Sequence, residues 1–242
     1  MPARRRIRRL WGGALAAAAL SAHAAQALPL LISEYVEGSG SNKALEIYNP
    51  NPTPVDLSAG YRVRIYYNGK TTPGATIALS GQLAPGATTV LAHKSADPAL
   101  LAKAQLTSGS LNFNGDDAVV LLLHDTVLDS IGRIGEDPGT AWSAGGVSTR
   151  DRTLRRKPAI LGGDTDPTDL FDPSAEWLAF PKDSFEDLGV HLALAPLGVQ
   201  GAPAQPPAPA TLPPTASLLG IGLLAGAALP MLRHRDRTGR GP

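Results

Sequence analysis

The chain has 242 residues, no cysteine and a formal net charge of +1 at pH 7, so disulfides, thiol catalysis and thiolate metal sites are excluded. The charge is unevenly distributed along the chain, because residues 28–201 hold 13 Lys and Arg against 20 Asp and Glu, a balance of −7. An acidic domain repels phosphate backbones, which disfavours nucleic acid as a partner.

The first 27 residues have the three parts of a secretory signal peptide. Five arginines lie between Arg4 and Arg9, an apolar run follows at 10–20, and Ala25-Gln26-Ala27 is a small-residue cleavage site. The run is too short for a permanent transmembrane helix, which needs about 20 residues. The sequence therefore predicts export, by the general or the twin-arginine route, and cleavage after Ala27.

Short segments of alternating apolar and polar residues follow, bounded by Gly, Pro and Asn. In the clearest one, Val63 and Ile65 alternate with Arg62 and Arg64, which is the period of a strand. The predicted strands are 30–36, 44–48, 61–66, 76–79, 88–92, 118–123 and 127–131.

The strand at 118–123 is apolar on both faces, which predicts a central position in a sheet. Only His124-Asp125-Thr126 separates it from the strand at 127–131, so the two are predicted to form a hairpin. Short strands with turns between them are typical of an antiparallel β-sandwich, which we place in a single domain at 28–194.

One short helix is predicted at 97–103. Asp97 is a good N-cap residue, and Pro98 suits the first helical position. The fold class predicted from the pattern is therefore all-β with one short helix.

Closely spaced aspartates in the segment 164–172 suggest a cation site. Asp164, Asp166 and Asp169 follow two glycines, and hard oxygen ligands in a loop suit Ca²⁺. The segment lacks the glycine and glutamate of an EF-hand loop, and aspartates before Pro and Thr are also ordinary turn and capping residues. Calcium is the one metal that this sequence suggests, and no other cofactor is expected.

The C-terminal part reads as a linker followed by a membrane anchor. Residues 195–214 include a Pro/Ala-rich stretch, a composition that stays extended. The run at 216–232 is uncharged and is followed by Arg233 and further arginines, the pattern of a short transmembrane helix with a cytoplasmic basic tail. We therefore predict that residues 215–242 anchor the chain in a membrane.

This arrangement resembles the PEP-CTERM sorting signal of Gram-negative bacteria, with its proline-rich linker, apolar helix and arginine cluster. The resemblance covers about the last 35 residues, one linker plus one helix. It implies handling by an exosortase and an association with exopolysaccharide. The chain departs from the pattern at Pro207-Ala208-Pro209, where the family has Pro-Glu-Pro, so cleavage of the tail stays open.

A second resemblance covers roughly residues 33–190. The opening segment at 32–49 is similar to that of bacterial lamin tail domains, and later segments match in the same order. Those later segments are 55–58, 113–118, 129–132 and 153–157. The resemblance implies an immunoglobulin-like β-sandwich that serves alone or as an accessory module, with no catalytic residues to carry over.

Three glutamates raise the question of paired-carboxylate chemistry. Glu34 and Glu46 are expected on neighbouring strands, close enough to share a cation or Lys43, with Glu37 nearby. Acid–base catalysis would need a raised pKa in a cleft, which a sequence cannot show. The favoured interpretation is that they face solvent and that Lys43 is a salt-bridge partner.

The remaining basic residues, turn residues and histidines that could suggest a site are interpreted as structural. Arg150 to Lys157 form a basic cluster that we interpret as a solvated strand end, and Asn114-Gly115 is interpreted as a turn. His93, His124 and His191 lack the spacing of zinc ligands.

The function expected from the sequence is non-catalytic. We expect an interaction or adhesion module, exported to the cell envelope or extracellular matrix, whose partner is a protein or a polysaccharide. The alternative is an accessory domain or a minor metal-dependent phosphodiester hydrolase, which would need converging carboxylates and usually a histidine in a cleft.

Overall fold

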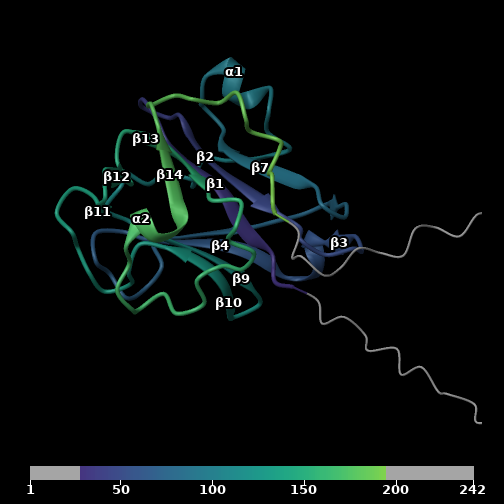
Figure 1. The fold of residues 1–242 in the computed structure, drawn as a ribbon, viewed down its shortest axis with the longest axis horizontal. Coiled ribbons are helices and arrows are strands. Elements are labelled where there is room, and N and C mark those ends of the chain that lie inside the picture. Colours follow the sequence, from purple (N-terminus) through teal and green to yellow (C-terminus); the bar gives the residue numbers. More distant parts are fainter. Residues whose placement is uncertain (1–27, 195–242) are drawn as a thin grey trace, which may run out of the picture. The chain divides into compact units, whose positions relative to one another are not determined.

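The computed structural model describes residues 28–194, which fold into two packed β-sheets (Figure 1). The larger sheet has the strand order β14-β13-β1-β2-β7-β8, and the smaller has the order β10-β9-β4-β5. The larger sheet consists of β1 (Leu31–Glu37), β2 (Lys43–Tyr48), β7 (Thr88–His93), β8 (Leu106–Ser108), β13 (Arg152–Arg156) and β14 (Trp177–Phe180). The smaller sheet consists of β4 (Tyr61–Tyr66), β5 (Ala75–Ala78), β9 (Ala118–Leu123) and β10 (Thr126–Ile131). The predicted all-β, immunoglobulin-like sandwich is confirmed.

The remaining elements are short. They are the strand pairs β3 (Val55–Asp56) with β6 (Gln82–Leu83) and β11 (Ser143–Ala144) with β12 (Val147–Ser148), the 3-10 helix η1 (Leu57–Ala59), and the helices α1 (Pro98–Leu101) and α2 (Pro173–Glu176). The predicted helix is α1, where the Asp97 carboxylate accepts a hydrogen bond from Ala99 N at 2.8 Å. The prediction of a single helix was wrong, because Asp172 and Pro173 begin α2 with the same capping chemistry.

One strand pair departs from the predicted antiparallel arrangement. β7 and β8 run parallel, with Leu91 opposite Leu106. Parallel neighbours need a crossover connection, and α1 lies within it. The other strand pairs within residues 28–194 are antiparallel.

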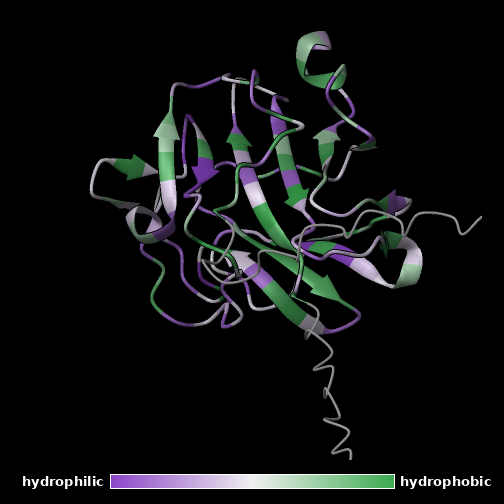
Figure 2. Ribbon diagram, turned by 45° about the vertical axis from the view of Figure 1, so that its right-hand side comes forward, coloured by the Kyte–Doolittle hydropathy of each residue, from purple (hydrophilic) through white to green (hydrophobic). Residues whose placement is uncertain are grey.

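The main core fills the space between the sheets. In Figure 2, hydrophobic and hydrophilic residues alternate along several strands. Because successive side chains of a strand point to opposite faces, one set of side chains from each sheet reaches the core. Val63 and Ile65, which share one face of β4 as the alternation predicted, are fully buried there. Tyr35 of β1 stacks on Phe113 with the ring centroids 4.7 Å apart, which ties the larger sheet to the segment before β9.

The predicted central strand and hairpin are both confirmed. β9 lies between β10 and β4, and its residues Val119 and Val120 are fully buried although they face opposite ways. Leu123 pairs with Thr126 across the tight turn into β10.

The predicted signal peptide at 1–27, the linker at 195–214 and the anchor at 215–242 lie outside the described residues. Within residues 28–194, no helix has the length and apolarity needed to cross a membrane.

Candidate functional site

A polar row crosses the outer face of the larger sheet. Glu34 of β1 lies directly between Arg155 of β13 and Glu46 of β2 in the strand register. Their sequence neighbours, among them Leu45 and Leu154, point into the main core, so the row faces away from it. Side chains directly opposite each other in a sheet have Cβ atoms about 5 Å apart, so the predicted proximity of the two glutamates is confirmed.

The interpretation that these glutamates face solvent was wrong. Glu34 is 2% exposed and Glu46 is 1% exposed. The cause is a segment far away in the sequence, residues 184–194, which we call the strap and which lies over this face of the sheet. Lys43 pairs with Glu37 at 2.5 Å and is itself buried, so it is the salt-bridge partner of Glu37 and not of Glu34 or Glu46.

Buried groups of the sheet hold the strap in place. The Glu46 carboxylate accepts a hydrogen bond from Gly189 N at 2.5 Å, and Thr153 Oγ1 donates to Ser184 O at 3.0 Å. Near its end, Leu194 N donates to Pro158 O at 2.8 Å. Leu188 packs into a second apolar cluster, together with Leu100 of α1 and Val36 of the sheet.

Between the row and the strap lies a cavity of about 340 Å³, which we call the outer-face pocket. Its polar lining is Ser33, Glu34, Glu46, Arg155, Arg156, Glu186, Asp187 and His191. Its apolar lining is Pro158, Leu178, Phe180, Val190 and Leu192. The pocket therefore combines charged groups at its base with apolar side chains, the composition typical of a small binding site.

Glu34 has the most perturbed acid–base chemistry in the pocket. Burial raises the pKa of Glu34 to about 8, against the opposing effect of Arg155 and with further repulsion from Glu46, Asp187 and Glu186. Its Oε1 atom is buried and has no hydrogen-bond partner. The group is thus largely protonated at neutral pH, and one of its oxygens has no hydrogen-bond partner within the described residues.

Glu46 is also perturbed, but it is satisfied. Burial raises the pKa of Glu46, while hydrogen bonds from Ser33 Oγ, at 2.7 Å, and from Gly189 N oppose this effect. Its carboxylate is already engaged in holding the strap. The two glutamates therefore have different roles, although they lie side by side.

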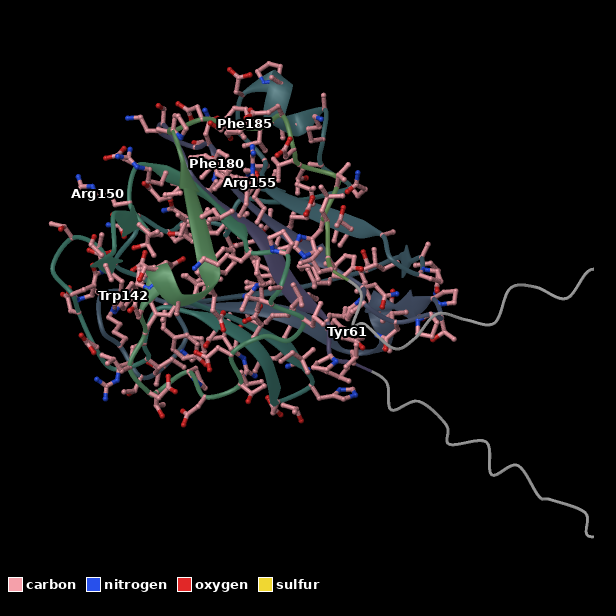
Figure 3. All side chains as sticks on the ribbon, in the orientation of Figure 1. Tyr61, Trp142, Arg150, Arg155, Phe180 and Phe185 are labelled. Carbon is pink, nitrogen blue, oxygen red and sulfur yellow. The ribbon has the colours of Figure 1, made fainter. Side chains whose placement is uncertain are left out.

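Arg155 is the cation of the pocket, and acidic groups surround it. It lies 3.6 Å from Glu34 and 3.0 Å from Glu186, and it also pairs with Asp187. Its guanidinium lies 3.9 Å from the centre of the Phe180 ring, and the two labelled side chains lie together beside β14 in Figure 3.

Arg156, the next residue of β13, lies in a buried ionic cluster. Its guanidinium pairs with Asp129 at 2.6 Å and with Glu176, and it lies over the Trp177 ring. The Asp129 carboxylate also accepts from Ile32 N, at 2.7 Å. Even so, burial raises the pKa of Asp129 to about 6. The interpretation of the basic cluster as a solvated strand end was therefore wrong for Arg156.

The other members of that cluster have separate surroundings. Arg150 and Arg152 are exposed, whereas Lys157 Nζ donates to the carbonyls of Ser174 and Ala175 at the end of α2. The five basic residues thus form no common surface.

The three aspartates proposed as calcium ligands lie in a separate loop. Asp164 accepts from Ser130 Oγ at 3.1 Å, and Asp166 accepts from Thr168 Oγ1 at 2.6 Å. Repulsion from Asp164 is the largest cause of the raised pKa of Asp169, so these carboxylates lie near one another. Across residues 28–194, however, the structure has no group of three or more His, Asp or Glu side chains placed to hold a metal ion. Calcium binding stays a prediction from sequence.

A second polar cavity, of about 350 Å³, lies among loops at Gly38, Asn114 and Arg150. Its central charges are already paired, Lys43 with Glu37 at 2.5 Å and Lys182 with Asp151 at 3.1 Å. The turn predicted at Asn114-Gly115 is present there, with Gly115 at φ +98°. This cavity thus offers fewer unsatisfied groups than the outer-face pocket.

His191 is the site residue that sequence reasoning set aside. It lines the outer-face pocket, lies edge-on to Tyr48 and has a buried Nε2 atom without a hydrogen-bond partner. Burial lowers the pKa of His191, so that its ring is neutral at pH 7. Of the other histidines, His93 Nδ1 accepts from Ser95 N and His124 occupies the β9–β10 turn. No sequence spacing could have singled out His191, because only the strap brings it to the sheet.

Comparison with known families gives one match. Residues 23–135 match the family model of the Lamin Tail Domain, a span just short of half the chain. Domains of this family are immunoglobulin-like and typically serve as non-catalytic interaction modules. No curated protein and no solved structure matches the chain. The matched span contains Glu34 and Glu46, whereas Arg155, Phe180 and the strap lie beyond it.

Proposed function

We propose that this chain, with its lamin-tail-like sandwich, is an exported, non-catalytic binding module of the cell envelope or extracellular matrix. Its partner, a protein or a polysaccharide component of that compartment, is bound at the outer-face pocket. Export and membrane anchoring rest on the signal-peptide pattern at 1–27 and the apolar, arginine-flanked pattern at 215–242.

The observation that carries this proposal is the composition of the pocket. It holds a buried carboxyl oxygen without a partner, on Glu34, next to exposed apolar side chains. Leu178 is 44% exposed and Leu192 is 76% exposed, and both line the pocket. Buried polar atoms normally have partners, and clustered exposed apolar residues mark contact sites in soluble domains. Both features are accounted for by a ligand in the pocket.

The site favours binding over the alternative, phosphodiester hydrolysis. That reaction would need Glu34, Glu46 and the 164–172 loop to converge, but Asp164 and Asp169 line a different depression, together with Glu176. The carboxylates around the outer-face pocket would also repel an anionic phosphodiester. Glu46, moreover, already holds the strap.

The test compares binding by the full chain and by a pocket variant. The detergent-solubilised protein is titrated with separated protein and polysaccharide fractions of the envelope and matrix, using biolayer interferometry. We expect saturable binding to one fraction and at least a tenfold loss of affinity in the double variant Leu178→Gln, Leu192→Gln. Leu170→Gln is the matched control, because Leu170 is 83% exposed and lies outside the pocket. Equal binding by the double variant would refute the proposed site.

A further inference from the structure

We propose that the outer-face pocket receives a lysine side chain of a partner protein, with the ammonium group at Glu34 and the aliphatic stem along Leu178 and Leu192. This inference rests on the function proposed above and narrows it to one ligand chemistry. It also assigns a binding role to Glu34, Leu178 and the strap together, and two of these three lie outside the family match.

The charge around the pocket favours a cation. Four carboxyl groups line it, those of Glu34, Glu46, Glu186 and Asp187. Two arginines line the pocket, but Arg156 is already paired with the carboxylates of Asp129 and Glu176. The guanidinium of Arg155 is therefore the one positive charge among the described lining residues that offsets these carboxyl groups. A cationic group entering this cavity therefore meets an excess of acidic partners, of which Glu34 and Glu46 are buried, whereas Glu186 and Asp187 are more than half exposed and are screened by water.

The free acceptor atoms favour an ammonium over a guanidinium. Glu34 Oε2 faces Arg155 at 3.6 Å, so Oε1 is the oxygen left for a ligand. A guanidinium gains its advantage from bidentate pairing with both oxygens of a carboxylate, whereas an ammonium is a point charge with three separate donors. The neutral ring of His191 adds a second atom without a partner, Nε2, to the same lining, and that nitrogen can accept in one tautomer.

The apolar part of the lining suits the stem of the same side chain. Lysine buries its methylene groups along apolar surfaces and keeps its charge at a polar site. Leu178 of β14 and Val190 and Leu192 of the strap are exposed large apolar residues, and all three line the pocket. A ligand with an apolar stem and a cationic end thus matches both parts of the pocket, whereas a polysaccharide hydroxyl would match only the polar part.

Binding of this kind should release a proton. The carboxyl group of Glu34 is held neutral by its burial, and the groups facing it are Arg155 from β13, Glu46 from β2, and Glu186 and Asp187 from the strap. A cation next to Glu34 favours its ionised form. Affinity should therefore rise as the pH increases from 6 to 8, and the increase should depend on Glu34.

The experiment titrates the detergent-solubilised full chain with n-butylammonium, n-butylguanidinium and n-butanol, and follows leucine methyl groups by NMR. We expect n-butylammonium to bind at least fivefold more tightly than either of the other probes, with shifts at Leu178 and Leu192. Glu34→Gln should weaken n-butylammonium binding at least tenfold and abolish its pH dependence. Glu136→Gln is the matched control, since Glu136 lies outside the pocket and should leave both unchanged.

A second variant keeps the test decisive should Glu34→Gln fail to fold. Leu192→Gln alters an exposed residue, so the fold should survive, and it should weaken n-butylammonium binding about threefold or more. Equal binding of n-butanol and n-butylammonium, or an unchanged affinity in Leu192→Gln, would overturn the lysine proposal.

The outcomes also distinguish the lysine proposal from the binding function. If an envelope component binds through Leu178 and Leu192 but n-butylammonium does not compete with it, the proposed ligand class is wrong and the binding function stands. If that component binds independently of both leucines, both proposals fail.

Discussion

Burial of individual ionisable side chains shifts their pKa values in this domain, and Glu34 is the clearest case. The pKa of Glu34 is raised from 4.5 to about 8. At pH values between these two pKa values, the carboxyl group of Glu34 is ionised in the unfolded chain and protonated in the folded domain. The folded state then binds more protons, so stability must fall as the pH rises through this interval, by about 1.4 kcal/mol per pH unit at most.

We expect the free energy of unfolding to decrease between pH 6 and pH 8, and Glu34→Gln to flatten that decrease. Urea unfolding followed by circular dichroism at pH 6, 7 and 8 measures the slope. The window starts at pH 6 because Asp129, whose pKa is about 6, contributes mainly below it. The Glu136→Gln variant should keep the wild-type slope. A slope that Glu34→Gln leaves intact would show that Glu34 is ionised in the folded protein.

Arg156 gives a second prediction at this scale. Replacing it by leucine leaves the fully buried Asp129 without its cation, at 0% side-chain exposure. Breaking a buried ion pair from one side costs about 3–5 kcal/mol. Arg156→Leu should therefore lower the melting temperature strongly, whereas Arg152→Leu, at the exposed start of the same strand, should change stability by less than about 0.5 kcal/mol. Similar melting temperatures for both variants would contradict the buried cluster.

The sequence predicted which of these residues are neighbours but not how deeply they lie. Strand alternation was enough to place Glu34 next to Glu46. It could not show their burial, because Glu46 is covered by Gly189, 143 residues further along the chain. Arg156 presents the same difficulty, since its partners Asp129 and Glu176 belong to elements that only the fold brings together.

At the scale of elements, the most predictable strands were those with a clean pattern. β4 and β9 have the predicted bounds, because strict alternation and a fully apolar run each leave a clear signature. β13 was hidden by its arginines, and β14 directly follows a helix. The parallel β7–β8 pair had no signal in the sequence, since periodicity carries no information on strand direction.

The hairpin of β9 and β10 provides a prediction at this scale. Leu121 of β9 is fully buried in the main core. Leu121→Asp would place a carboxylate there without a partner, at a cost of several kcal/mol against a total stability of about 5–15 kcal/mol. We expect loss of the cooperative thermal transition in circular dichroism. The control is Leu170→Asp, at an 83% exposed position, which should melt like the wild type. Retention of the transition in Leu121→Asp would contradict the core assignment.

For the molecule as a whole, the family match is shorter than the folding unit that the structure describes. The match ends at 135, but β13 pairs with β1 in the larger sheet and supplies Arg156 to Asp129. We expect residues 28–194 to fold alone with a β-rich far-ultraviolet spectrum and dispersed amide NMR signals. Residues 28–135 should show neither, because β1 would have an open edge and Asp129 would lack its cation. A folded 28–135 fragment would refute this dependence.

The tail provides the other prediction at this scale. Deletion of 215–242 should turn a membrane-associated protein into a soluble exported one, because an uncharged run such as 216–232 would otherwise expose a large apolar surface to water. Cell fractionation and the intact mass of the mature protein test this. A cut near Pro207–Thr211 would instead remove the whole run. A full-length protein found soluble outside the cell with its tail uncut would contradict both the anchor and the sorting signal.

The strap also gives the domain a mechanical property. Tension pulling on the chain from residue 195 onward would load the strap first, through the contact of Leu194 with Pro158 and then that of Gly189 with Glu46. These hydrogen bonds are spaced along the strap, so they would break one after another, starting at Leu194. The strap would then detach from the larger sheet before the strands of that sheet separate. Because the strap forms one wall of the outer-face pocket, a sustained pull would open the pocket and shorten the lifetime of whatever is bound there.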